Sequence, residues 1–566
     1  MPPTIVTYFS FSELNNGVKA TIEEFRAELS KFNAIQVLYA CGVMNSMTRD
    51  WQGNTRPGVV EELVRNSFQK WAADQIIAEL HNPRRPRGLY HRQQFLFVAK
   101  ESLSYCPTTG GKNPLLPEHS GEMARVLLMA NDLLHKGLTE HLSTAEQMMN
   151  VMSEFIPIAE ANGFNRPMHK ILRSHIMIER FLPDVGGEIH GLFQRTTGVP
   201  LEDYFALCFA TLCRYVDLDF KKYQADPSLF VLSSGWYRTT PIGEPIIANF
   251  LTEISAAVSE FKDALTRGSK EATDFTCFRA KPYLRDELNH LLIDPIFLAE
   301  KSESGVFWSI NNGLRTDQRA QFHQDWGLAF EQYINWLMEE SVDEIVNKFH
   351  PNPKFSDNGE EVCDAMMLCG DSVVFIESKG ATFTVEAKYG TNPAKLREEI
   401  EKKVVESSGH KKGIAQLAVR IEQVFCRSRP RKVEGVDLSR VVKVYPVLIT
   451  RDDIGAALVF NAYLAARFRE LFRRKRVSVT VTPPFSLSAQ DVEMLCGYLP
   501  YAGLTDLLEQ RYRAQPSLLS SFWLVDNPII NRLGNRECKP FADAMHTYVE
   551  TVKERLFPGL EVPEFL

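Results

Sequence analysis

The segment CDAMMLCGDSVVFIESKG (363–380) has an aspartate, Asp364, a glutamate, Glu377, and a lysine, Lys379, around two apolar runs. Within it, Gly370-Asp371 suits a two-residue hairpin loop of type II′, because that turn needs glycine at its first central position. Folding about this loop pairs residues whose numbers have a constant sum, so Asp364 is predicted to face Glu377. Alternation along the second strand then places Lys379 on the same face as Glu377. The spacing therefore predicts two carboxylates and an ammonium group at one end of a hairpin.

This combination of groups favours metal-assisted chemistry at phosphorus. Two carboxylates about 5 Å apart repel each other by about 3 kcal/mol at an effective dielectric constant of about 20. A divalent cation between them would remove that repulsion, and Mg²⁺ fits best because it takes carboxylate oxygens and accepts phosphate oxygens. A neighbouring ammonium group can stabilise charge that develops on a phosphorus centre. The other interpretation is a solvent-exposed strand pair, but both strands are otherwise nearly continuous apolar runs, as buried strands are.

A helix is predicted ahead of the hairpin, in HQDWGLAFEQYINWLMEESVDEIV (323–346), where apolar residues form one stripe at helical spacing. Glu331 borders this stripe, so its carboxyl is expected at the edge of a buried interface. Gly327, one turn earlier, leaves room for a ligand or another backbone.

Further elements are predicted after the hairpin. Residues 396–425 indicate a helix, a loop and a second helix, on which Lys412, Gln416 and Arg420 recur four apart on a face suited to phosphate contacts. Residues 441–450 form a buried strand, which we place toward a sheet edge because its Pro446 cannot donate to a ladder.

A second Glu-x-Lys pair, Glu386 and Lys388, lies in FTVEAKYG. We expect these side chains to share a strand face as well, but they lie too far along the chain to oppose Asp364 through the tight turn. They form the alternative catalytic pair.

Composition excludes several classes of protein. The 566 residues are 44% hydrophobic and 24% charged, which is typical of multidomain soluble globular chains. The ten cysteines include no Cys-x-x-Cys pair, so neither a zinc ribbon nor an iron–sulfur ligand set is visible. Neither a signal peptide nor a long apolar run is present, which predicts a cytoplasmic protein with no membrane partner. No complete phosphate-binding loop is present, so no nucleotide cofactor is expected.

Charge and pattern differ along the chain. The first 300 or so residues are mostly helical by pattern, interrupted by strand-like pieces at 93–100 and 229–234. The net charge of −7 argues against a protein that coats nucleic acid, yet residues 401–480 are markedly basic. Within that stretch we expect nucleic-acid contacts from Lys411, Lys412 and Arg420.

The ordered set of an acid on a helix, an acid and a Glu-x-Lys on a hairpin, and a glutamine on a following helix resembles the PD-(D/E)XK nuclease superfamily. That superfamily includes restriction endonucleases, junction resolvases and exonuclease modules. The resemblance covers about residues 320 to 500, and Cys363 stands where the naming motif has proline. It implies an α/β core in which a mixed central sheet is flanked by helices. By position it implies Mg²⁺ or Mn²⁺ ligation by Asp364, Glu377 and the Ser378 carbonyl, catalysis by Lys379, and accessory roles for Glu331 and Gln416.

We therefore expect a multidomain chain of three parts. Residues 1–315 form a mainly α-helical domain that selects substrate or senses a trigger, 316–510 form the restriction-endonuclease-like nuclease domain, and 511–566 form a helical extension packing on it. The expected activity is Mg²⁺-dependent hydrolysis of DNA phosphodiester bonds. By family analogy, such proteins often belong to prokaryotic antiviral defence, acting as homo-oligomers or with a partner protein. The alternatives are a catalytically idle nucleic-acid-binding or scaffold protein of the same fold, or an RNase.

Overall fold

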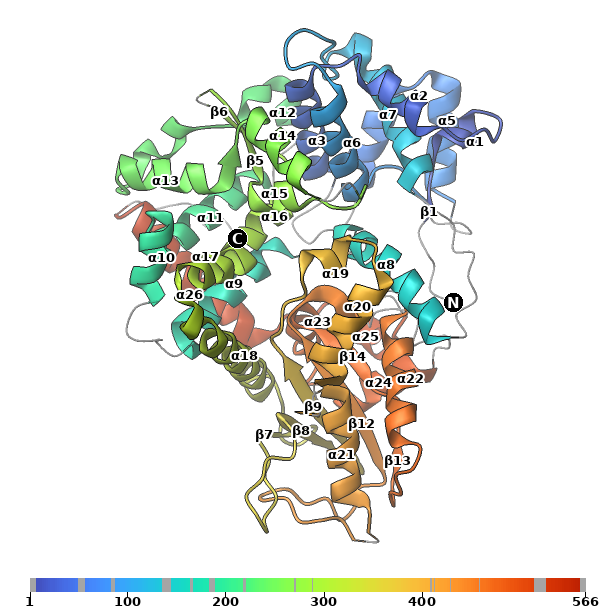
Figure 1. Ribbon diagram of the computed structural model, residues 1–566, viewed down its shortest axis with the longest axis vertical. Coiled ribbons are helices and arrows are strands. Elements are labelled where there is room, and N and C mark those ends of the chain that lie inside the picture. Colours follow the sequence, from blue (N-terminus) through green and yellow to red (C-terminus); the bar gives the residue numbers. More distant parts are fainter. Residues whose placement is uncertain are drawn as a thin grey trace.

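Helices make up most of the chain and surround two larger β-sheets of mixed strand direction (Figure 1). The computed structural model describes residues 7–48, 56–82, 87–134, 144–162, 166–182, 189–216, 220–268, 271–287, 289–407, 410–411, 413–427, 429–457, 459–513 and 526–559. Among the helices in these ranges, none is both long and apolar enough to cross a membrane.

The six-stranded sheet has the strand order β13-β12-β9-β8-β7, and β14 also pairs with β12. Its strands β7, β8 and β9 are antiparallel neighbours, whereas β12 runs parallel to β9, β13 and β14. The direction changes because a tight loop joins β8 to β9, while a helical crossover leads from β9 to β12. The strand bounds are β7 (Lys348–Pro351), β8 (Ala365–Cys369), β9 (Ser372–Lys379), β12 (Lys443–Thr450), β13 (Thr480–Val481) and β14 (Phe485–Ser488).

The hairpin of β8 and β9 has the predicted register. Cys369 pairs with Ser372, and the pairing continues to Ala365 opposite Ile376, so Asp364 follows in line with Glu377. Gly370 has a φ of +61°, the left-handed conformation that the first central position of the loop requires.

Helices cover both faces of this sheet, and Figure 1 shows α21 lying across its strands. One face of β9 presents Val374 and Ile376 to a core that includes α18 (Thr316–Glu339), α23 (Ala489–Leu495) and α24 (Leu504–Arg513). The other face presents Val373 and Phe375 to a core that includes α20 (Pro393–Ile400), α21 (Gly413–Phe425) and α22 (Phe460–Phe472). Burial on both faces explains why β9 is almost continuously apolar.

The edge position predicted for residues 441–450 is wrong, because β12 has neighbours on both sides. Lys443 and Val444 pair with β13, and Val447 to Thr450 pair with β14. Pro446 falls in the gap between these two partners, where the ladder on that side is interrupted and needs no N–H.

The N-terminal part of the chain is mainly helical, as predicted, with a four-stranded sheet of order β3-β6-β5-β4. The strand expected at 93–100 is wrong, because these residues lie within helix α6 (Arg92–Tyr105). Residues 229–234 contain the short strand β3 (Val231–Ser233) between two 3₁₀ turns. The other strands of this sheet are β4 (Ser255–Ala256), β5 (Tyr283–Asp286) and β6 (Asn289–Leu292), and the longer helices are α3 (Ala34–Met47), α7 (Pro117–Leu134) and α11 (Leu201–Val216).

Some packing crosses the boundaries predicted from the sequence. Helix α8 (Ala145–Asn162) packs on α20 and α22, beside which it lies in Figure 1. In the C-terminal segment, α25 (Pro528–Leu533) contacts α24, whereas α26 (Lys539–Leu556) packs against α11 and α9 (Pro167–Ile176) of the N-terminal part. The three-domain division stays a prediction.

Candidate active site

The three side chains singled out on the hairpin converge at its open end. Lys379 Nζ lies 2.7 Å from Glu377 Oε2 and 3.7 Å from Asp364 Oδ2. The side chain of Glu377 is fully buried, and that of Lys379 is only 19% exposed. These groups therefore do not point apart into solvent, and the ammonium group lies against both carboxylates.

Asp364 is held in place from two directions. Its Oδ2 accepts a hydrogen bond from the backbone N–H of Ser378 at 2.6 Å. Its backbone carbonyl accepts a hydrogen bond from the N–H of Asn352 at 2.9 Å. Two of the three predicted metal ligands, Asp364 and Glu377, thus lie together around Lys379.

The protonation equilibria of this site are shifted from their ordinary values. Burial raises the pKa of Glu377 to about 8, since the charge of Asp364 adds to the effect and Lys379 offsets only part of it. Burial would lower the pKa of Lys379, but the charges of Glu377 and Asp364 outweigh it and raise the pKa. Glu377 Oε1 is buried and has no hydrogen-bond partner among the described residues.

Helix α18 brings Glu331 to the same site. Burial, together with the negative charges of Asp364 and Glu361, raises the pKa of Glu331 to about 7. The helix can approach the end of β9 because Gly380 has no side chain, since a Cβ on Gly380 would lie 2.9 Å from the Gly327 Cα. The space that the sequence predicts beside Gly327 is open, because a Cβ on Gly327 would meet no atom within 4 Å.

Sequence reasoning missed two contributors to the site, Glu361 and Asn352. Partial desolvation and the charge of Asp364 raise the pKa of Glu361. Asn352 has a φ of +46°, and its side-chain amide, oriented to donate, lies 3.0 Å from Glu331 Oε1. The signal for Asn352 was local, since asparagine is the residue that best tolerates the left-handed region after glycine.

The predicted nucleic-acid contacts and the accessory residue Gln416 lie on α21 or just before it in the chain. Arg420 lies on α21, but its guanidinium donates to Glu360 Oε1 at 3.0 Å and to Gln423. Gln416 is partly exposed on the same helix, which packs against β9. Lys411 belongs to the short strand β11 (His410–Lys411), and Lys412 lies outside the described residues. These four assignments stay predictions.

The strand predicted for the alternative pair is wrong. Residues 385–389 form helix α19 (Val385–Tyr389), which begins after Thr384, whose hydroxyl accepts the N–H of Ala387. As a result Glu386 is exposed, whereas the buried Lys388 lies 2.9 Å from Asp452. The two side chains do not share a strand face with each other.

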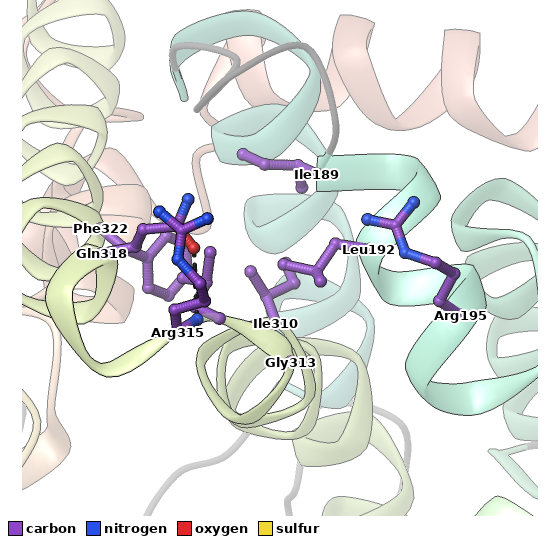
Figure 2. A pocket seen from close by; sticks show the side chains of 9 residues that line it. Ile189, Leu192, Arg195, Ile310, Gly313, Arg315, Gln318 and Phe322 are labelled. Carbon is purple, nitrogen blue, oxygen red and sulfur yellow. Dashed lines mark hydrogen bonds between the residues drawn. The ribbon is translucent and has the colours of Figure 1, made fainter.

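A cavity of about 260 Å³ lies away from the hairpin, between α10 (Ile189–Thr197), α17 (Val306–Gly313) and the start of α18. Figure 2 shows Arg195 and Arg315 on opposite sides of it. None of the predicted site residues lines this cavity. Its place is therefore no guide to the chemistry of the hairpin.

Comparison of the chain with protein-family models, curated proteins and solved structures found no match. Within the described ranges, no group of three or more His, Cys, Asp and Glu side chains is arranged to hold a metal ion. The side chains at the hairpin end can nevertheless do defined chemistry. They offer hard oxygen donors, carboxyl groups that titrate near neutral pH, and one ammonium group.

Proposed function

We propose that this protein is a metal-dependent nuclease of the PD-(D/E)XK type that hydrolyses phosphodiester bonds of DNA. The observation that carries the proposal is the convergence of Asp364, Glu377 and Lys379 at the end of one buried hairpin. A helix bearing Glu331 before the hairpin, and a crossover helix bearing Gln416 before the parallel strand β12, support the same assignment.

The residues present fit a hard divalent cation. Asp364, Glu377 and the Ser378 carbonyl would hold Mg²⁺ or Mn²⁺ through oxygen atoms, the donors that these ions prefer. The unpartnered Glu377 Oε1 is a buried acceptor of the kind that a cation satisfies. When bound, Mg²⁺ supplies Lewis-acid stabilisation of a phosphoryl oxygen.

The side chains of the chain itself have distinct tasks in such a reaction. The Lys379 ammonium group stabilises the negative charge that builds on the phosphoryl oxygens as water attacks. The Glu331 carboxyl, with a pKa of about 7, can hold or release a proton at neutral pH. The Asn352 amide orients that carboxyl through its Oε1.

The proposal is tested by incubating the full-length protein with plasmid, linear duplex, single-stranded DNA and RNA, in Mg²⁺ or in EDTA. We expect DNA cleavage that requires Mg²⁺ and is lost in Asp364→Asn. Glu386→Gln is the matched variant, because it removes the exposed acid of the second Glu-x-Lys pair and should keep full activity.

Other outcomes identify the alternatives. Cleavage that survives Asp364→Asn and disappears in Glu386→Gln would move the site to the second pair. Cleavage of RNA alone would make the protein an RNase. Binding of nucleic acid without cleavage in any metal would leave a catalytically idle protein of this fold.

A further inference from the structure

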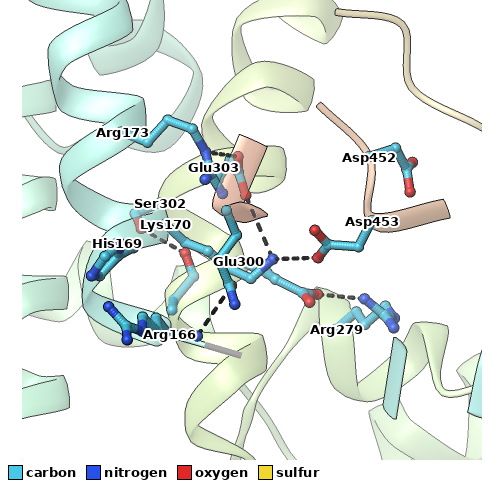
Figure 3. A network of polar contacts seen from close by, with 12 residues as sticks. Arg166, His169, Lys170, Arg173, Arg279, Glu300, Ser302, Glu303, Asp452 and Asp453 are labelled. Carbon is cyan, nitrogen blue, oxygen red and sulfur yellow. Dashed lines mark hydrogen bonds and ion pairs between the residues drawn. The ribbon is translucent and has the colours of Figure 1, made fainter. Parts of the chain in front are cut away.

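A second group of charged side chains is buried between the N-terminal helices and the six-stranded sheet (Figure 3). Arg173 and Lys170 project from α9, and Glu303 from the short helical segment η4 (Lys301–Gly305). Asp453 opens the 3₁₀ turn η6 (Asp453–Ala456), and Glu493 belongs to α23. The side chains of Arg173 and Glu493 are 1% and 0% exposed, so their charges are removed from water.

One side of this charge cluster contacts the helix that carries Glu331. Arg173 Nε donates to Glu303 Oε1 at 3.0 Å, and its Nη1 donates to Glu493 Oε1 at 2.5 Å. The same Glu493 oxygen accepts the hydroxyl of Tyr333 at 2.8 Å. Tyr333 lies on α18 two residues after Glu331, so the cluster fixes this turn of the helix.

The other side contacts the end of β12, next to Lys379. Lys170 Nζ lies 3.1 Å from Asp453 Oδ2 and 3.9 Å from Glu303 Oε2. Asp453 comes three residues after Thr450, which pairs with Lys379 in the sheet. Between them, the Arg451 N–H donates to the Lys379 carbonyl at 3.1 Å.

Neighbouring cations, including the nearby Arg451, keep the carboxylates of this cluster ionised. Burial would raise the pKa of Glu303, but the charges of Arg173 and Lys170 outweigh it and lower the pKa to about 2. Buried ion pairs of this kind add little net stability, yet they strongly disfavour arrangements in which a charge is left unpaired. They are therefore suited to fixing one relative placement of the elements that they join.

We propose that this buried charge cluster positions the candidate catalytic side chains, holding α18 and the end of β12 in one arrangement around the hairpin. The inference rests on the nuclease function proposed above. It makes Lys170, Arg173 and Glu303 positioning residues, although they lie in the part of the chain expected only to select substrate or sense a trigger. The catalytic unit then extends beyond residues 316–510 into the N-terminal helices.

The experiment compares two buried tyrosines in the full-length protein. Tyr333→Phe removes only the hydroxyl that binds Glu493, and the control Tyr237→Phe removes a hydroxyl that hydrogen-bonds Thr211 away from the site. Both side chains are at most 1% exposed, so each variant removes one buried tyrosine hydroxyl. We expect Tyr333→Phe to lower kcat for Mg²⁺-dependent DNA cleavage about tenfold with KM unchanged, because small displacements of catalytic groups slow the chemical step. Tyr237→Phe should keep the wild-type kcat.

Lys170 provides a second test with its own rescue. Lys170→Met should lower kcat about tenfold as well, because it releases Asp453 from α9. Lys170→Arg keeps the charge and should restore most of the activity. Unchanged kcat in folded Tyr333→Phe and Lys170→Met would overturn the inference while leaving the nuclease function intact.

Hydrogen exchange separates failure of the inference from failure of the function. Wild-type protein that cleaves no nucleic acid would overturn the proposed nuclease. In that case, faster amide exchange confined to residues 326–334 and 450–455 in the two variants would still support positioning of these elements. Amide exchange that is unchanged, or raised throughout the chain, would overturn the inference that the charge cluster positions these elements.

Discussion

The two buried groups of charges differ in how they are balanced. In the charge cluster between α9 and α23, Glu303 and Glu493 share the Arg173 guanidinium, and Asp453 faces Lys170. The Arg451 guanidinium supplies a third positive charge near Glu303, so three cations face three carboxylates. At the end of the hairpin, Asp364 and Glu377 share the single Lys379 ammonium group. The charges of Glu331 and Glu361 add to the negative excess there.

The same burial has opposite results in the two places. Desolvation acts to raise the pKa of both Glu303 and Glu377. Arg173 and Lys170 reverse this for Glu303, whose pKa falls to about 2, whereas Lys379 cannot reverse it for Glu377, whose pKa rises to about 8. The difference therefore comes from the neighbours. A buried site with more carboxyl groups than cations is suited to take up a metal ion in place of a proton, whereas the matched cluster is suited to hold elements together.

The largest effect is expected at the hairpin end, the unmatched site of Asp364, Glu377 and Lys379, when it loses its ammonium group. Lys379→Met keeps most of the side-chain length, and we expect kcat/KM for DNA cleavage to fall about a thousandfold, because charge stabilisation at phosphorus is lost. Affinity for Mn²⁺ should instead rise, since the ammonium group no longer repels a cation beside the carboxylates. Steady-state cleavage and Mn²⁺ titration measure the two quantities.

Lys388→Met is the informative comparison, because Lys388 is also buried, pairs with Asp452, and belongs to the second Glu-x-Lys. It should keep cleavage activity. If Lys379→Met lost Mn²⁺ binding together with cleavage, the Lys379 ammonium group would not be repelling a cation at the carboxylates.

Breaking the matched cluster should give the next largest effect, on stability. Arg173→Met leaves two buried carboxylates without their main partner, and we expect the free energy of unfolding to fall by about 3 kcal/mol in urea denaturation. Arg315→Met is the control, because Arg315 and Asp317 are 73% and 70% exposed and their ion pair should contribute nothing measurable. Equal stability of the two variants would show that the cluster is not balanced by Arg173.

The hairpin was predictable because its determinants are local. The turn preference of Gly370 and the constant-sum register follow from a few neighbouring residues, and they brought Asp364, Glu377 and Lys379 to one place. The position of β12 was not predictable in this way. The effect of Pro446 depends on which strands lie beside it, and these come from distant segments.

Local pattern also failed where helices are buried on all sides. Residues 93–100 lie in α6, nearly all of whose side chains are buried, so no amphipathic period distinguishes it from a buried strand. The charge cluster escaped prediction for a different reason. Arg173, Glu303 and Glu493 are each more than a hundred residues apart, and no spacing rule connects single charges at that separation.

The dependence of stability on pH gives a sharper form of the comparison, with opposite signs for the two sites. The folded pKa of Glu303 lies below its ordinary value of 4.5, so its contribution is present above about pH 4.5 and is lost as the pH falls toward 2. The folded pKa of Glu377 lies above 4.5, so its contribution is present at low pH and is lost as the pH rises through about 8.

Urea denaturation at pH values from about 2 to 8 measures these contributions, when the free energies of unfolding of Glu303→Gln and Glu377→Gln are each compared with that of wild type. Without metal, wild type should lose roughly 3 kcal/mol relative to Glu377→Gln between about pH 5 and 8. Relative to Glu303→Gln it should lose stability only on acidification. Mn²⁺ should reduce the pH dependence of the stability difference between wild type and Glu377→Gln, and should leave that between wild type and Glu303→Gln unchanged. If both stability differences changed with pH in the same direction, the assignment of the two environments would be contradicted.

The smallest expected effect concerns the approach of α18 to β9, which brings Glu331 to the unmatched site. A Cβ on Gly380 would meet the Gly327 Cα at 2.9 Å and the Phe330 Cβ at 3.2 Å, whereas a Cβ on Gly327 would meet no atom within 4 Å. Gly380→Ala should therefore lower the free energy of unfolding by about 1 kcal/mol through overpacking. Gly327→Ala should raise it by up to about 1 kcal/mol, because alanine favours the helix.

Cleavage assays on the same pair connect this packing to the site. Gly380→Ala should also slow cleavage, because α18 must move away from the hairpin together with Glu331. Gly327→Ala leaves the two backbones in place and should keep the rate. A Gly327→Ala variant that is stable yet inactive would show that the open space beside this residue receives substrate. If Gly380→Ala and Gly327→Ala changed the free energy of unfolding in the same direction, the close approach of the two glycines would not set the position of α18.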